Sequence, residues 1–119
     1  MGSPFVTRGK IVLVPFPFDD LTAAKVRPAV CLTDPVGSHR HVVLAFITSK
    51  APDDLAETDI ALEVNHPDFT ATGLRVSSTL RLHRLMTAST SLIVRELGEL
   101  SAAVQTQVVD RLRKLFALE

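Results

Sequence analysis

Two polar side chains with chemistry to offer stand at the ends of apolar runs in the first half of the chain. Arg27 precedes Pro28 at the start of the run RPAVCLT, and Thr48 ends the run HVVLAFIT. A guanidinium group stays charged at any working pH, and its planar fork can bind two phosphoryl oxygens at once. A threonine hydroxyl can donate a hydrogen bond to a phosphate oxygen. Together these groups would suit a site that stabilises negative charge on a phosphoryl group.

Each of these residues also has an ordinary structural interpretation. Arg27 could form an exposed ion pair with Asp19 or Asp20, and Thr48 could owe its position to the β-propensity of threonine. Ser49 could line a phosphate site or cap the following turn. From these residues taken alone, the exposed ion pair is the better interpretation of Arg27.

A second group of candidates could contact the backbone of a nucleic acid. Lys25 lies two residues before Arg27, and His83 lies in the segment between Arg81 and Arg84. Each of these side chains could equally be a solvated surface group. Because imidazole titrates near neutrality, His83 is the histidine that we would test for acid–base catalysis.

Composition limits the class of protein. The 119 residues are 46% hydrophobic, which suits one domain with a real core. Lys plus Arg number 13 and Asp plus Glu number 13, so the net charge of zero argues against a dedicated duplex-binding protein. The charges are nevertheless segregated, because residues 51–70 contain acidic side chains without Lys or Arg, and residues 71–95 show the reverse. Such a chain can present a basic face, or its charges can balance in three dimensions.

Several kinds of site are excluded by what the sequence lacks. Cys31 is the single cysteine, so neither an internal disulfide nor a cysteine metal cluster can form. No metal-ligand motif is recognisable, and we expect no metal and no cofactor. The N-terminal residues MGSPFVTRGK do not resemble a signal peptide, and no apolar run approaches the roughly 18 residues of a membrane helix. The sequence therefore predicts a cytoplasmic protein without a membrane segment.

The elements that must position the candidate residues are mostly strands. Apolar and β-branched runs predict strands at residues 11–18, 27–33, 41–48, 60–64, about 80–85 and 92–97. Pro15 and Pro17 place the first strand at a sheet edge, or themselves at a strand end, because proline cannot donate to a ladder.

The C-terminal segment has a different periodicity. Val104, Val108, Leu112 and Leu115 recur at helical spacing, and Ser101 is a suitable N-cap. Several short strands followed by one amphipathic helix predict a small, strongly bent antiparallel sheet or barrel with the helix packed on it.

In their order and spacing, these pieces resemble the MazF/PemK toxin family. The matching pieces are GKIVLVPFPFDDL, RPAVCLTD, VVLAFITS, the run from Gly73-Leu74 through Ser78, Arg81, Arg84-Leu85 and Thr87, and LIVRELGEL before the helix. The resemblance extends from Gly9 to about Leu118. It is carried by the order of the pieces, since the dipeptides "RP" and "TS" are weak signals alone.

The resemblance implies a mainly β fold with a C-terminal helix, an SH3-like small barrel of the CcdB/MazF type. The single domain would span residues 1–119, with strands over about 9–98 and the helix over about 101–117. It also implies a homodimer, a cognate antitoxin, and sequence-specific, metal-independent cleavage of single-stranded RNA. In such cleavage the 2′-hydroxyl attacks the phosphorus, leaving a 2′,3′-cyclic phosphate and a 5′-hydroxyl.

The family's catalytic residues map onto two positions of this chain. The catalytic arginine of the RP motif corresponds to Arg27, and the catalytic threonine or serine that ends the next strand corresponds to Thr48. The resemblance also gives the arginine a part in proton transfer, an unusual role for a group of such high pKa. The first loop, DDLTAAKV, lacks the glycines and glutamate that many members carry there, so cleavage specificity does not carry over.

Two other functions remain open on the sequence. A gyrase poison of the CcdB type would share the fold and bind a protein without a catalytic site. A noncatalytic RNA-binding module of the same fold is the second alternative. The RP and ITS motifs favour the nuclease because a gyrase poison needs neither, and intact Arg27 and Thr48 weigh against a noncatalytic module.

Overall fold

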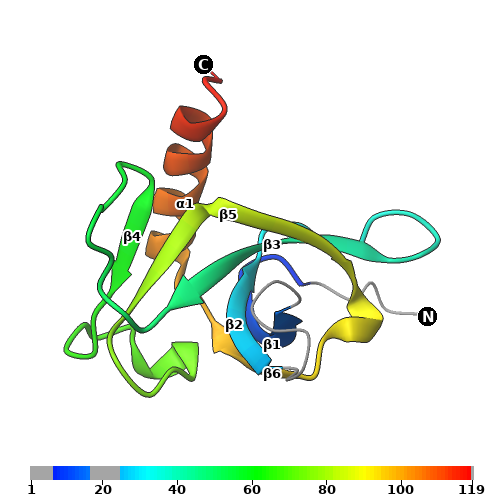
Figure 1. Ribbon diagram of the computed structural model, residues 1–119, viewed down its shortest axis with the longest axis horizontal. Coiled ribbons are helices and arrows are strands. Elements are labelled where there is room, and N and C mark those ends of the chain that lie inside the picture. The colour runs from blue at the N-terminus through cyan, green and yellow to red at the C-terminus, as the bar shows by residue number, and fades with distance from the viewer. Residues whose placement is uncertain (1–6, 17–24, 119) are drawn as a thin grey trace.

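Six antiparallel strands form one curled sheet in the computed structural model, which describes residues 7–16 and 25–118 (Figure 1). In chain order the elements are β1 (Lys10–Phe16), β2 (Lys25–Cys31), β3 (His41–Thr48), β4 (Asp59–Leu62), β5 (Ser78–Ser89), β6 (Arg95–Glu99) and α1 (Ala102–Leu115). The strand order across the sheet is β4-β5-β3-β2-β1-β6. The predicted fold class, mainly β with a C-terminal helix, is confirmed.

The observed strands depart from the predicted ranges where pairing partners decide the ends. β3 occupies the predicted range, but β5 is longer than predicted and β6 begins only at Arg95. The shorter β6 has a local cause, because residues 90–92 form a 3₁₀ turn whose preceding residue, Ser89, accepts a hydrogen bond from the backbone N–H of Ser91.

Two prolines of the first half, Pro15 and Pro28, lie where a strand has only one neighbour. β1 is not an edge strand, since it pairs with both β2 and β6, but its pairing with β6 ends at Leu13, before Pro15. β2 begins at Lys25 and contains Pro28, whereas the sequence predicted a strand that starts at Arg27. Residues 25–28 pair with β1 alone, because the β2–β3 ladder covers only residues 29–31. Pro17 lies outside the described residues.

Apolar side chains form one cluster on each face of the sheet. Ile11, Val30, Ile47, Leu80 and Val108 belong to the cluster that α1 covers, and α1 contacts β4 and β5 (Figure 1). The cluster on the other face contains Val12, Val14, Cys31, Leu44 and Phe46. Because side chains alternate along a strand, Phe46 and Thr48 share the face that α1 does not cover.

The helix begins where the sequence predicted an N-cap. The Ser101 hydroxyl accepts a hydrogen bond from the backbone N–H of Val104 at 3.3 Å. Farther along α1, Arg111 Nη1 donates to the carbonyl oxygens of Glu57 at 2.7 Å and Asp59 at 2.9 Å. These bonds tie the helix to the segment that leads into β4. Within the described part of the chain, no helix has the length and apolar character to cross a membrane.

Candidate active site

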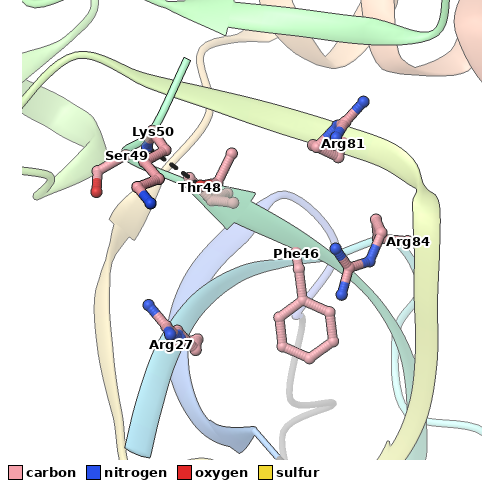
Figure 2. Close-up of a pocket in the computed structure, with 8 residues that line it drawn as sticks. Arg27, Phe46, Thr48, Ser49, Lys50, Arg81 and Arg84 are labelled. Atoms are coloured by element: carbon pink, nitrogen blue, oxygen red, sulfur yellow. Dashed lines mark hydrogen bonds between the residues drawn. The ribbon is translucent and has the colours of Figure 1, made fainter. Parts of the chain in front are cut away.

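The ends of β2 and β3 that carry Arg27 and Thr48 part from each other. The last bonded pair of the two strands is Ala29 with Phe46, and Arg27 and Thr48 each lie two residues beyond it. Past this pair, β2 continues along β1, and β3 continues along β5. The opening between them is a cavity of about 370 Å³ that Arg27 and Thr48 both line (Figure 2).

A bulge in β5 forms another wall of this cavity. Ala45 pairs with Leu85 and Ile47 with Leu80, so residues 81–84 of β5 all lie opposite Phe46 alone. Extra residues in one strand bend it and redirect its side chains. Here the bulge brings Arg81 and Arg84 to the cavity (Figure 2).

The cavity gathers five of the seven residues that the sequence nominated. Its lining residues are Arg27, Phe46, Ile47, Thr48, Ser49, Lys50, Arg81 and Arg84. Four of these eight side chains are basic and none is acidic, so the lining that the structure describes suits an anionic ligand. The roles of the five nominated residues stay predictions.

Lys25 and His83 do not line the cavity. Lys25 is exposed at the first position of β2, paired with Phe16. His83 is exposed on the β5 bulge, where its Nδ1 atom lies 3.9 Å from Oδ1 of Asp59. These two candidates are therefore not among the residues that line the cavity with Arg27 and Thr48, and their roles stay predictions. The ion pair considered for Arg27 involves Asp19 and Asp20, which lie outside the described residues.

Sequence reasoning missed Phe46, Ile47 and Lys50 as lining residues. Phe46 could have been found from strand alternation, because it lies two residues before Thr48 on the same face. Lys50 follows Thr48 and Ser49 directly, and its backbone N–H donates to Thr48 Oγ1 at 3.1 Å. This bond uses the hydroxyl as an acceptor and leaves its proton to be donated toward a ligand.

Arg81 is engaged by a buried carboxylate behind the cavity wall. Its Nε donates to Asp59 Oδ1 at 3.2 Å and its Nη2 to Asp59 Oδ2 at 3.1 Å. The side chain of Asp59 is 2% exposed and that of Arg81 is 15% exposed. The sequence predicts either an RNA contact or a solvated charge at Arg81. The structure shows a largely buried ion pair in place of a solvated charge, and the RNA contact stays a prediction.

The surroundings of Asp59 favour its ionised form. Burial alone would raise its pKa, but the hydrogen bonds from Arg81 and the Ala56 backbone N–H lower it. The charges of Arg81 and His83 act in the same direction, and the net effect is a lowered pKa. The acidic segment and the arginine-rich segment thus meet in three dimensions at this pair.

Comparison with known proteins gives the family. The family model described as "PemK-like, MazF-like toxin of type II toxin-antitoxin system" matches residues 7–116. The chain belongs to this family. The family predicted from the order of the sequence pieces is confirmed, although no curated protein sequence matches the chain significantly.

Solved MazF structures share the fold. The Mycobacterium tuberculosis toxin MazF-mt6 is 20% identical with a TM-score of 0.70, and the match covers 92% of this chain and 98% of that one. A MazE–MazF complex from Deinococcus radiodurans matches at 18% identity and a TM-score of 0.68, covering 97% and 99%. An endoribonuclease with its cognate antitoxin from a mycobacterial species matches at 17% identity and 0.67, covering 94% and 95%. At identities this low, the matches show a shared fold and nothing more.

Proposed function

We propose that this MazF-family protein is an endoribonuclease that cleaves single-stranded RNA without a metal ion. The observation that carries the proposal is the placement of Arg27 and Thr48 across the open end of β2 and β3, in a cavity with further basic groups and no acidic lining residue among those described. Such a lining suits the phosphodiester backbone of a single strand, which must enter a concave site to be cut.

The proposed reaction uses the RNA's own nucleophile. The 2′-hydroxyl loses its proton and attacks phosphorus, the bond to the 5′-oxygen breaks, and that oxygen gains a proton. Arg27 compensates the charge that builds on the phosphoryl oxygens, and it hydrogen-bonds the departing 5′-oxygen in keeping with the family's proton-transfer arginine. Thr48, held by the Lys50 backbone N–H, donates its hydroxyl proton to a phosphoryl oxygen. Ser49, Lys50 and Arg84 hold the flanking backbone.

RNA cleavage in excess EDTA tests the proposal directly. Wild-type protein is incubated with a set of single-stranded RNAs, and product ends are identified by mass. We expect cyclic-phosphate ends at a short motif, and no cleavage where the nucleotide 5′ of the cut carries a 2′-deoxy sugar. Arg27→Ala and Thr48→Ala should each lower the rate by about a hundredfold or more.

A matched control separates the site from general basicity. Arg75→Ala removes an exposed arginine that does not line the cavity, and its rate should equal that of wild type. If wild-type protein left every RNA intact yet stopped cell growth, the endoribonuclease proposal would be wrong and the gyrase-poison alternative would replace it.

The same proposal includes partners. Two of the similar structures are described as complexes with an antitoxin, MazE in one of them. We propose that this protein forms a homodimer and is neutralised by a cognate antitoxin, whose acidic and apolar tail covers the face that carries Arg27. An acidic, apolar peptide should compete with RNA for the protein, and failure to compete would refute this mode of neutralisation. Sedimentation equilibrium measures the dimer.

A further inference from the structure

The carboxylate of Asp59 lies outside the cavity and binds Arg81, in the part of β5 that forms the cavity wall. Asp59 and Arg81 are register partners of β4 and β5, and Arg81 is the last residue of β5 that β4 pairs. The bulge begins there and ends at Leu85, where pairing with β3 resumes. Asp59 is therefore placed to fix one end of the segment that carries Arg84.

We propose that Asp59 is a positioning residue for RNA cleavage: by clamping Arg81, it holds the β5 bulge in the shape that presents Arg84 to the phosphate beside the scissile bond. The inference rests on the proposed endoribonuclease function and assigns different tasks to the two arginines of the bulge. Arg81 holds the cavity wall in place, and Arg84 contacts the substrate.

The geometry of the clamp restrains the arginine in more than one direction. Two nearly equal bonds, 3.2 Å from Nε and 3.1 Å from Nη2, join the guanidinium side-on to the carboxylate and fix its plane. Nη2 also donates to the carbonyl oxygen of Asp54 at 3.2 Å. The carboxylate is held in turn, because Oδ2 accepts the Ala56 backbone N–H at 2.8 Å.

Because the Arg81–Asp59 pair is buried, its main effect is to restrain the cavity wall, and it attracts RNA only weakly. Removing one partner of a buried pair leaves an uncompensated charge, so the pair stays together. The adjacent carboxylate compensates the charge of Arg81, so this guanidinium attracts a phosphate less than its formal charge alone would suggest.

Asp59 contacts the bulge at a second point and is itself anchored to the helix. Its Oδ1 atom lies 3.9 Å from His83 Nδ1, and His83 directly precedes Arg84. Its carbonyl oxygen accepts a hydrogen bond from Arg111 Nη1 of α1 at 2.9 Å. Between the two contact points, Leu82 is fully buried in the core beneath α1. Arg81, Leu82 and His83 of the bulge are thus all held from the side away from the cavity. Arg84 is the residue that follows them in the bulge.

A double-mutant cycle separates positioning from other roles. Asp59→Asn keeps the shape of the side chain and removes its charge. Per folded molecule, measured by active-site titration with a 2′-deoxy oligonucleotide, we expect kcat to fall roughly tenfold to a hundredfold, with a smaller change in KM. In an Arg84→Ala background the same substitution should change kcat less than twofold, because Asp59 acts through Arg84.

Two further variants sharpen the cycle. Arg81→Lys keeps the charge and loses the side-on pair, so it should reproduce the kcat loss of Asp59→Asn. The control Asp54→Asn removes a carboxylate that is 92% exposed and 3.8 Å from Arg81 Nη2, and its kcat should match wild type.

Each result supports or overturns the proposal. Unchanged kcat in folded Asp59→Asn, or additive effects of Asp59→Asn and Arg84→Ala, would refute it. A lower KM with unchanged kcat would show that Asp59 only repels RNA. If wild-type protein cleaves no RNA, the proposed function fails by itself. In that case the cycle is measured with the Kd for a 2′-deoxy oligonucleotide. Additive effects of Asp59→Asn and Arg84→Ala on this Kd would again refute the positioning role.

Discussion

At the scale of single residues, the buried carboxylate of Asp59 links ionisation to stability. Its pKa in the folded protein lies below the ordinary 3.8. A lowered pKa means that folding favours the ionised form, so the stabilisation is present above the pKa of the unfolded chain and is lost as the pH falls through the folded value. The pair with Arg81 should therefore weaken in acid below about pH 4.

Urea titrations between pH 6 and pH 3 check this linkage. The free energy of unfolding of the wild type should decrease across the window, and that of Asp59→Asn should decrease less, because asparagine has no proton to gain. Asp34 should supply part of the remaining slope, since hydrogen bonds from the backbones of Arg8 and Thr7 lower its pKa too. Parallel curves for the two proteins would show that Asp59 does not contribute.

Cys31 is a second residue whose surroundings decide its chemistry. Burial, with a smaller contribution from the charge of Glu96, raises the thiol pKa to about 11, although a hydrogen bond with Thr7 opposes the rise. Only the thiolate reacts rapidly with disulfide reagents. At pH 8 the folded protein should react roughly a hundredfold more slowly with such a reagent than the urea-unfolded protein. Equal rates would contradict the buried position.

At the scale of elements, close backbone contacts place β6 against the 3₁₀ turn at Thr70–Thr72. A Cβ atom on Gly73 would collide with the carbonyl oxygen of Leu97, and one on Gly98 would collide with that of Ala71. Gly73 also has a φ of +73°, in the left-handed region. These glycines let the turn lie directly on β6, which pairs with β1.

Two alanine substitutions at matched φ separate backbone strain from collision. Gly37 has a φ of +76° with nothing within 4 Å of an added Cβ, so Gly37→Ala should cost only about 1 kcal/mol of stability. Gly73→Ala meets the same strain and the Leu97 backbone, and it should cost about 1–3 kcal/mol more. Denaturant unfolding of both variants measures the difference, and equal losses would show that β6 and the turn can move apart.

At the scale of the whole molecule, charge is balanced in total and uneven in place. The net charge is zero, and Arg81 and Asp59 compensate each other behind the wall. The described cavity lining contains Arg27, Lys50 and Arg84 and no acidic residue. A neutral protein exerts little long-range attraction on RNA, so the proposed binding must depend on these local contacts.

The salt dependence of RNA binding measures how many phosphates of the RNA the protein neutralises. Each phosphate neutralised on a single strand contributes about −0.7 to the slope of log K against log salt. The three basic groups Arg27, Lys50 and Arg84 predict a slope of about −2, and Arg84→Ala should make the slope shallower by about 0.7. Fluorescence anisotropy with a 2′-deoxy oligonucleotide measures the slope. Arg75→Ala, outside the cavity, should leave it unchanged, and an equal effect of both variants would contradict a local site.

Local patterns in the sequence determined the elements and the family. The buried run 41–48 is a strand because its apolar residues suit a sheet covered on both faces, and the 3.6-residue period after Ser101 suits one helix with a polar outer side. Arg27 and Thr48 could be nominated because they end such runs in the order that the family shows. Phe46 could have been added from alternation alone.

Pairing between distant residues decided the rest. The start of β2, the four-residue bulge of β5 and the position of His83 outside the cavity lining all depend on which strands lie side by side, and no local period encodes that. Arg81 looked like a surface arginine because its partner, Asp59, lies 22 residues away in sequence, and only the β4–β5 register brings the two together. Burial then turned two ordinary charges into one fixed pair, because removal from water makes separating them costly.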